Sequence, residues 1–349
     1  MRFDLFHEIS LPPQLHQDEA GAFDDFLDQA ALADQLGFGC LWLVEHHFMP
    51  QYSHSSAPDL LLAAVSQRTQ RLRLGLGVTP LPYHHPLQVA ERVATLDLLS
   101  NGRLEVGVGR GFSPQEFNAF GVEMAHSRSL TDESLDILRQ HWQGGPLSHH
   151  GGHFSFDGLE VVPRPVQHPH PPLWTAAVSP DTFIWAARQQ MGVLAGPFKP
   201  WWMVRHDIQQ YLEHWQAPQP PRAGMTVGIF CLPDGRRARE LAEPAFVWFY
   251  RQLFATTLPV LEKLYPSYEH FHDVGRFRHL LRLGIHLRLL ETLGMAVVGS
   301  PAQCIERLQA YRDAGVTHLL CAVGAGALAP ELVAESMHCL AEDVMPALA

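Results

Sequence analysis

Short apolar runs alternate with segments of helical periodicity along almost the whole chain. Runs such as GFGCLWLV and RLEVGVG are too uniformly apolar for a half-exposed sheet, and glycine or proline bounds them. Such runs are typical of parallel strands buried on both faces. Eight runs share the pattern, at residues 2–9, 37–44, 71–80, 103–109, 172–178, 191–197, 225–232 and 317–323. Eight strands with intervening helices predict an α/β fold, a closed (β/α)8 TIM barrel.

Helical segments are predicted between these strands. Residues 20–36 and 58–68 repeat apolar positions at helical spacing, Pro86 begins a further helix, and residues 114–142 contain helical segments. No composition shift marks a linker, so we expect a single barrel domain over residues 1–349.

Two regions interrupt the alternation and predict insertions in the barrel. Residues 143–171, after the fourth strand, are rich in Gly, Pro and His and predict an excursion with a short hairpin. Residues 243–298, after the seventh strand, are longer than one helix requires and carry scattered aromatic residues such as Tyr265, Tyr268 and Phe271. A long insertion in a compact domain is often functional, so we interpret 243–298 as a helical lid.

Composition narrows the class of protein. Among 349 residues, 46% are hydrophobic and 17% are charged, which is enough apolar material for a full core. The 25 Lys and Arg against 36 Asp and Glu give a net charge of −11, which disfavours nucleic-acid and anionic-membrane binding. Five cysteines without a C-x-x-C motif indicate reduced thiols. No apolar run reaches the ~20 residues of a transmembrane helix, so we expect a cytoplasmic protein.

Polar side chains follow several of the predicted strands. Reactive groups of a (β/α)8 barrel gather where strands end and βα loops begin. Glu45, His46 and His47 directly follow the strand LWLV. Because successive side chains of a strand alternate in direction, only one of these histidines is expected to face a pocket unless the chain bends. An imidazole there suits proton transfer, and a hydrogen-bonded rim histidine is the structural alternative.

A second candidate site is a set of possible anion-binding groups. Arg110 ends a glycine-rich strand, and small neighbours allow a phosphate to approach its guanidinium. A structural ion pair at the barrel rim would use the same residue. Ser179 and Pro180 have the pattern of a helix N-cap, whose free amides attract anions. Ser300 with Gln303 forms a capping box that we interpret as purely structural.

The 22 histidines require that metal catalysis be weighed. Metal-dependent barrels need ligands that converge from several strand ends, but the first predicted strand contributes only His7. The histidines of the 143–171 excursion flank glycine or proline, and none forms an H-E-x-x-H pair. The sequence therefore favours a site without a metal.

Four segments resemble the bacterial luciferase-like, flavin-dependent monooxygenase family, and the resemblance extends over nearly the whole chain. The family's pattern of EHHF, L-P-x-x-H-P and G-R-x-x-x-G-x-x-R-G occurs here in order and at the family's spacing. The matching segments are LWLVEHHF (41–48), residues 81–112, residues 117–133, and the C-terminal VGSPAQCIERL (298–308) with DVMP (343–346).

The resemblance implies FMN as the cofactor, supplied in reduced form by an NAD(P)H:flavin reductase and attacked by O2 to give a C4a-peroxide. It implies that His46 is the catalytic histidine, that Arg110 binds the phosphate, and that Gly77–Val78 forms a cis peptide under the flavin ring. The other cofactor-binding positions that it implies are Phe112, Ser113, Ala176, Ala177, Val178, Ser179 and Thr182. Family members pair through helices beside the early strands, which implies a homodimer.

The sequence departs from the luminous enzymes at four matched positions. Gly109 replaces a reactive cysteine, Ser113 a tyrosine, and Val178 an acidic residue, while Pro197 followed by Phe198 stands where a tryptophan is frequent. These differences argue against light emission and a long-chain aldehyde substrate.

The resulting hypothesis is a two-component FMN monooxygenase that acts on an apolar or aromatic substrate. The expected substrate pocket consists of Glu45, His47, Phe48, Tyr83, His85 and Trp201. Two alternatives remain open: a flavin- or deazaflavin-dependent oxidoreductase that transfers hydride on the same fold, and a non-catalytic flavin-binding homologue.

Overall fold

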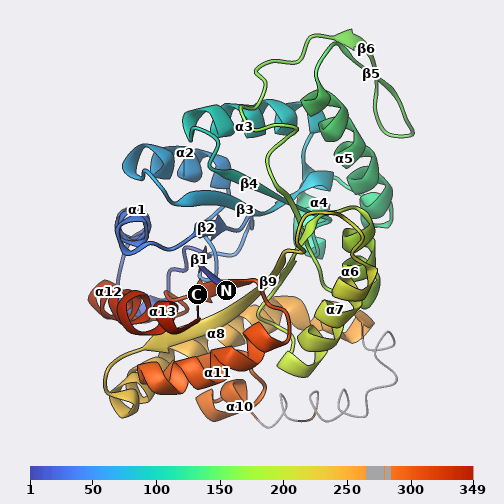
Figure 1. The fold of residues 1–349 in the computed structure, drawn as a ribbon. Helices are drawn as coiled ribbons and strands as arrows, with labels where there is room; N and C mark the ends of the chain where they lie inside the picture. Colours follow the sequence, from blue (N-terminus) through green and yellow to red (C-terminus); the bar gives the residue numbers. More distant parts are fainter. Residues whose placement is uncertain (265–278, 280–283, 349) are drawn as a thin grey trace.

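Eight parallel strands close into a barrel in the computed structural model, as the apolar runs predict (Figure 1). The structure describes residues 1–264, 279 and 284–348. Neighbouring strands follow the order β1, β2, β3, β4, β7, β8, β9 and β11, and β11 pairs with β1 to complete the ring. The barrel strands are β1 (Arg2–His7), β2 (Cys40–Leu43), β3 (Arg73–Pro80), β4 (Leu104–Gly109), β7 (Leu173–Ala176), β8 (Gly192–Ala195), β9 (Ala223–Cys231) and β11 (His318–Ala322).

Helices surround the barrel and pack apolar faces against its outer surface. The predicted helices at 20–36, 58–68 and from Pro86 are present, and the 114–142 region forms two α-helices separated by a 3-10 turn. The helices are α1 (Glu19–Leu36), α2 (Pro58–Arg68), α3 (Pro86–Leu99), α4 (Pro114–Ala119), α5 (Ser127–Gln143), α6 (Pro180–Arg188), α7 (Trp201–His214), α8 (Gly235–Leu264), α10 (Leu287–Thr292), α11 (Pro301–Asp313), α12 (Pro330–Cys339) and α13 (Met345–Leu348). Short 3-10 turns span Pro13–Leu15, Leu81–Tyr83 and Met124–His126, and a π-helical turn spans Leu340–Val344.

Two tryptophans fill the interior of the barrel. The rings of Trp42 and Trp174 meet edge to face with centroids 5.1 Å apart. Gly75 and Gly192 make room for them, because a Cβ at either position would lie 2.3 Å from an indole carbon. The lumen is therefore closed at this level, as in other packed barrels.

Charged residues close the amino-terminal end of the barrel below this tryptophan pair. Glu105 accepts hydrogen bonds from Arg2 at 3.0 Å, Arg73 at 2.7 Å and the indole of Trp174 at 2.5 Å. Asp4 accepts from the indole of Trp42 at 3.0 Å. Polar groups at this end of a (β/α)8 barrel stabilise the fold, which leaves the opposite end for the site.

The excursion after β4 contains an antiparallel pair, β5 (Leu147–His150) with β6 (Ser155–Leu159). This hairpin projects from the body of the molecule at the top of Figure 1. Glu133 of α5 fastens its tip, because its carboxylate accepts from the backbone N–H of Phe154 at 2.8 Å and from Nε2 of His149 at 3.0 Å. The hairpin is thus anchored to α5.

The structure describes regular elements at both ends of the segment 243–298. Its first part continues α8, and its last part holds α10 and a further strand, β10 (Ala296–Gly299), which pairs in parallel with the end of β9. β10 was not predicted because AVVG is only four residues long and the barrel does not need it for closure. Residues 265–278 and 280–283 lie outside the described residues, and these include Tyr265, Tyr268 and Phe271. The lid remains a prediction.

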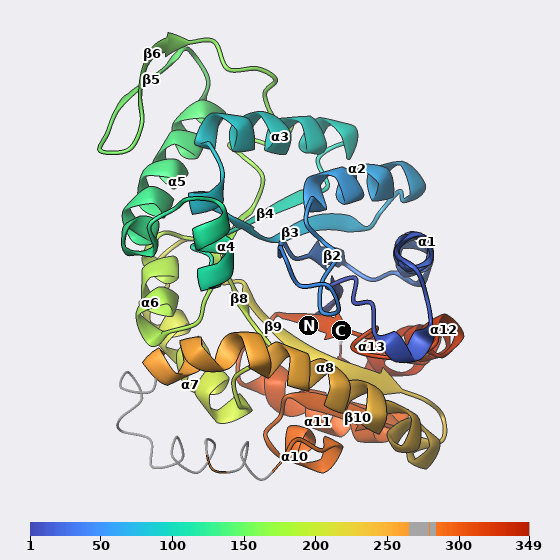
Figure 2. The same cartoon turned by 180° about the vertical axis from the view of Figure 1, so that it is seen from behind.

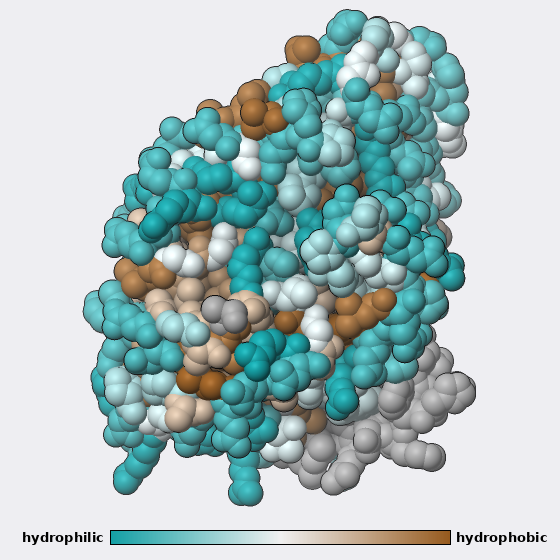
Figure 3. Space-filling view, viewed as in Figure 1, coloured by the Kyte–Doolittle hydropathy of each residue, from teal (hydrophilic) through white to brown (hydrophobic). Residues whose placement is uncertain are grey.

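All five cysteines are buried free thiols. The face shown in Figure 3 is largely hydrophilic, with smaller apolar patches between. Among the described residues, no helix is both long and apolar enough to cross a bilayer.

Candidate active site

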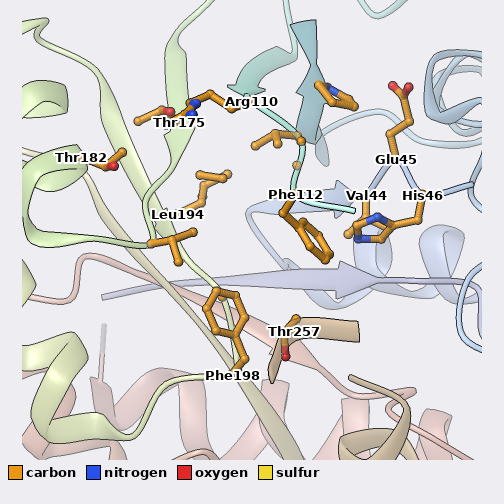
Figure 4. A pocket seen from close by; sticks show the side chains of 18 of the residues that line it. Val44, Glu45, His46, Arg110, Phe112, Thr175, Thr182, Leu194, Phe198 and Thr257 are labelled. Atoms are coloured by element: carbon orange, nitrogen blue, oxygen red, sulfur yellow. The ribbon is translucent and has the colours of Figure 1, made fainter. Parts of the chain in front are cut away.

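A cavity of about 460 Å³ opens at the carboxyl end of the barrel strands. Phe6, Val78, Leu194 and Leu320 form its base and also pack against the tryptophan pair of the lumen. Helices α4 and α8, which lie in front of the strands in Figure 2, contribute Glu116, Leu253 and Thr257 to the wall. Figure 4 shows Arg110 on one side of the cavity and His46 on the other, with Phe112 between them.

His46 follows β2 and meets Glu116 of α4. Its Nδ1 lies 3.5 Å from Oε1 of Glu116, within ion-pair range but without hydrogen-bond geometry. Burial lowers the pKa of His46, but Glu116, Glu8 and Glu45 oppose this effect, and the net pKa is raised. Because Nδ1 faces Glu116, the other ring nitrogen, Nε2, is the one left for a ligand.

Two donors hold the carboxylate of Glu116 in place. The backbone N–H of His47 donates to Oε1 at 2.9 Å, and the hydroxyl of Tyr83 donates to Oε2 at 3.1 Å. Burial raises the pKa of Glu116, but His46 and these two donors lower it by a larger amount, so the net pKa is below the usual value. Glu116 therefore remains an anion that can stabilise an imidazolium.

Glu45 lies on the same side of the cavity as His46. Its Oε1 contacts Nε2 of His84 at 2.5 Å and Nε2 of His47 at 3.2 Å. Burial raises the pKa of Glu45, but both imidazoles lower it, and the net pKa is lowered. Glu45 is thus a carboxylate that His84 and His47 hold in place.

Glu8, at the end of the first strand run, completes a group of three carboxylates around His46. Its Oε1 accepts from the hydroxyl of Tyr52 at 2.7 Å, whereas its buried Oε2 has no hydrogen-bond partner among the described residues. Burial raises the pKa of Glu8, and although His46 and the hydrogen bond from Tyr52 oppose this rise, the net pKa is above the usual value. We call Glu8, Glu45 and Glu116 with His46 the acid end of the cavity.

The opposite side of the cavity carries cationic groups. Arg110 directly follows β4 and donates through Nη2 to Oγ of Ser127 at 2.9 Å. Arg128 and Asp132 of α5 also line the cavity there. The pKa of Arg110 is lowered, mainly by burial and in addition by the charge of Arg128. We call Arg110 and Arg128 the basic end, where an anionic group would relieve their mutual repulsion.

The loop after β7 borders the basic end. Ser179 caps α6, as predicted: its Oγ accepts from the backbone N–H of Thr182 at 3.4 Å and lies 3.0 Å from Oγ1 of that residue. The buried ammonium of Lys199 donates to the carbonyl of Val178 at 2.9 Å and pairs with Asp207. The lysine thereby fixes the backbone of the loop that faces the cavity.

The base of the cavity contains the Gly77–Val78 peptide bond, which is cis, as the family resemblance implies. Gly109 packs directly on Val78, because a Cβ at position 109 would lie 2.6 Å from Cγ2 of Val78. The glycine at this matched position therefore leaves space for the valine. The neighbouring lining of Leu194 and Phe198 is apolar and suits a flat ring.

The structure brings together most of the predicted site residues. Those that line the cavity are Glu45, His46, Gly77, Val78, Arg110, Phe112, Ala176, Val178, Ser179 and Thr182. His46 lines it and His47 does not, in agreement with the expected alternation along the strand. Two predicted cofactor positions lie outside: Ser113 caps α4, and Ala177 is buried with its N–H bonded to the carbonyl of Leu194.

Five predicted substrate-pocket residues lie outside this cavity because they serve other contacts. The ring of His47 packs on Phe120, and Phe48 is 50% exposed. Tyr83 turns toward Glu116 and so acts on the site indirectly. His85 caps α3, and Trp201 packs against Tyr311.

Several lining residues were not singled out from the sequence, chiefly Tyr52, Glu116, Arg128 and Asp132. Glu116 and Arg128 follow the predicted fourth strand, so their place after a strand end was the available signal. Tyr52 carried none, because it lies in an irregular loop after β2. Among the described residues, no group of three His, Cys, Asp or Glu side chains is arranged to hold a metal ion.

A sequence model of the family described as luciferase-like monooxygenase matches residues 1–318. Protein y4wF of Sinorhizobium fredii is 41% identical over 177 residues, 49% of this chain and 52% of that protein, so the chain spans about half of its length. The alkanal monooxygenase alpha chain of the Kryptophanaron alfredi symbiont is 26% identical over 100% of this chain and 98% of its own length. The oxygenase component of the flavin-dependent trigonelline monooxygenase of Acinetobacter baylyi is 30% identical over 62% of this chain and 59% of its own.

Solved structures share the fold. Monooxygenase RslO1 from Streptomyces bottropensis superimposes with a TM-score of 0.83 at 27% identity, covering 100% of both chains. The oxygenating constituent of 3,6-diketocamphane monooxygenase from Pseudomonas putida, solved in complex with FMN, gives a TM-score of 0.82 at 19% identity. It covers 100% of this chain and 99% of its own.

Proposed function

Because the chain belongs to the luciferase-like monooxygenase family, we propose that it is a flavin-dependent monooxygenase that binds reduced FMN and uses O2 to oxygenate an apolar or aromatic organic molecule. The observation that carries the proposal is one cavity that joins a basic end to an acid end across an apolar base. A cofactor that carries a phosphate and a flat ring needs the basic end and the apolar base, and proton transfer needs the acid end.

The residues fit FMN. Arg110, Arg128 and Ser179 with its helix start would hold the phosphate, since guanidinium groups and helix N-termini both favour anions. The Gly77–Val78 backbone and Leu194 offer an apolar support for a flat ring. A relative solved with FMN has the same fold. When bound and reduced, FMN supplies the electrons and the carbon to which O2 adds.

Three tasks remain for the protein itself. His46 holds a proton on Nε2 and delivers or accepts it at the reacting oxygen, with Glu116 stabilising its cationic form. Phe112, Leu253 and Phe198 reduce access of water, which would otherwise compete with the substrate. Lys199 keeps the loop of Val178 in one conformation.

We also propose a separate flavin reductase as the partner, because the relative from Acinetobacter baylyi is named an oxygenase component. Homodimer formation and a cytoplasmic location remain predictions.

Oxygen uptake tests the function. The protein is titrated with FMN and FMNH2, then combined with a flavin reductase, NADH and aromatic candidate substrates under 18O2. Substrate-dependent incorporation of one 18O atom is expected. Substrate reduction or oxidation without 18O would replace the proposal by hydride transfer, and FMN binding without any turnover would indicate a flavin-binding homologue.

A further inference from the structure

Glu8 is a carboxylate in the cavity wall that the proposed reaction does not use. Only 6% of the residue is exposed, and it directly follows β1, which lies three strands around the barrel from β4, the strand before Arg110. Its Oε1 is occupied by the hydroxyl of Tyr52, itself buried and packed on Phe249. The carboxylate is therefore held in one position, with Oε2 lacking a donor among the described residues.

The other charges at the acid end are already occupied. Glu116 is held by Tyr83 and the backbone N–H of His47, and Glu45 is held by His84 and His47. His46 provides a single positive charge at most against three carboxylates. The acid end thus stays net negative when all three are ionised, whether His46 is protonated or neutral.

Several other residues of the cavity wall are apolar. Phe6, Val44 and Leu253 line the same cavity as Glu8, and none can donate a side-chain hydrogen bond. A buried acceptor in an apolar wall is satisfied best by a ligand that brings its own donor. An anionic ligand group would meet like charge instead, which selects against it.

We propose that the acid end is the substrate subsite for a hydrogen-bond-donating head group, a hydroxyl or a protonated amine, on an otherwise apolar molecule, and that it excludes carboxylates. Glu8 is the specificity-determining residue. The inference rests on the proposed function, because it assigns the basic end to FMN and leaves the acid end to the substrate.

Binding of three probes with one skeleton tests the subsite: 1-naphthalenemethylamine, 1-naphthalenemethanol and 1-naphthoate. Dissociation constants are measured by calorimetry at neutral pH, with the protein saturated with oxidised FMN and again without flavin. We expect the amine and the alcohol to bind, and the amine to bind at least about tenfold more tightly than the carboxylate, as charge-assisted contacts do.

Two variants test whether the charge of Glu8 itself, and not the overall negative charge of the protein, sets the preference for the amine. Glu8→Gln keeps an acceptor for Tyr52 but removes the charge, and should reduce the amine-to-carboxylate preference to within about threefold. Glu123→Gln removes an exposed carboxylate outside the cavity lining, and should retain the wild-type preference. Thermal melting shows that each variant is folded.

Three results would overturn the proposal: tight binding of 1-naphthoate to the FMN-saturated wild type, failure of both the amine and the alcohol to bind, or an unchanged preference in folded Glu8→Gln. If that variant does not fold, the wild-type ranking still decides. The flavin proposal is judged separately by FMN titration and oxygen uptake, so failure of one leaves the other measurable.

Discussion

The Nδ1 atom of His46 lies 3.5 Å from Oε1 of Glu116, although the two residues come from different βα loops. Tyr83 and the backbone of His47 keep that carboxylate anionic and in place. The pair resembles the carboxylate–imidazole arrangement that orients a general acid or base and stabilises its cation. Glu116 is a positioning residue in this arrangement, because it acts through the histidine.

Replacing Glu116 should lower the pKa of His46. Glu116→Gln removes one of the charges that raise this pKa, so the imidazole should lose its proton at lower pH than in the wild type. The position of the His46 Cε1 proton resonance against pH measures the shift, and a steady-state pH profile that depends on the protonated imidazole should move to lower pH with it. Glu123→Gln, on an exposed turn, is the control. An unchanged His46 titration would remove Glu116 from its assigned role.

Loss of the imidazole should separate chemistry from cofactor binding. In His46→Ala, oxygenation should fall by ~10²-fold or more while affinity for FMN persists, because the basic end is unaltered. Single-turnover oxygenation and flavin fluorescence report the two effects independently. The exposed His338→Ala should behave like the wild type. Full turnover by His46→Ala would contradict the assignment.

Arg110 should act through the phosphate. Arg110→Met keeps the apolar stem but removes the guanidinium, and the dissociation constant for FMN should increase by about 10- to 100-fold, the range for a charge-assisted contact. Riboflavin lacks the phosphate, so its affinity should be unchanged in the same variant. Equal losses for FMN and riboflavin would mean that Arg110 shapes the cavity instead of binding an anion.

Gly109 and Val78 should depend on each other. A Cβ at position 109 would meet Cγ2 of Val78 at 2.6 Å, so Gly109→Ala must displace the valine at the base of the cavity. Overpacking of this kind costs ~1–3 kcal/mol. Urea unfolding and FMN titration should both show a defect in Gly109→Ala. Adding Val78→Ala to this variant should relieve the defect. Additive effects in the double variant would show that the contact does not matter.

Buried histidines should make the fold sensitive to acid. Burial lowers the pKa of His7 and His141 to about 4 and that of His318 to about 3, with a contribution from Arg164 at His141 and from Arg2 at His318. In the unfolded chain these groups titrate near ~6.5. The free energy of unfolding should therefore be fully retained above about pH 6.5 and fall as pH decreases toward about 4, by up to ~1.4 kcal/mol per pH unit for each histidine.

Urea unfolding measured at several pH values tests this acid sensitivity. His338→Gln, whose side chain is 51% exposed, should not change the slope, whereas His141→Gln should reduce it. A free energy of unfolding that does not change between about pH 7 and about pH 5 would contradict the prediction.

Much of the architecture could be predicted without coordinates. The eight apolar runs became the eight barrel strands, and α2 begins at Pro58 and ends at Arg68 as predicted. Ser179 and Ser300 cap their helices as their local patterns indicate. These features depend on a few adjacent residues, whose burial or capping is visible in the sequence. The short strand β10 was missed because its pairing with β9 is a contact between distant segments.

The candidate site could be predicted only in part, again because several of its contacts join residues that are distant in the sequence. His46 and Arg110 could be identified from their positions after strands and from a family resemblance. Tyr83 was assigned to the substrate pocket, but it turns toward Glu116, a contact that strand alternation cannot reveal. Glu8 lies in the first predicted strand run, residues 2–9, but its pairing with Tyr52 could not be predicted from the sequence.

Hydrophobic periodicity, with the glycine and proline residues that bound the apolar runs, determined that this protein is a parallel barrel and where its strands end. Each such pattern reflects the burial of one segment. Barrel closure alone decided which loop ends become neighbours, since that depends on strand order and loop conformation. It brought Glu8, Glu45 and Glu116 around one imidazole and placed Arg110 and Arg128 on the far side of the same cavity.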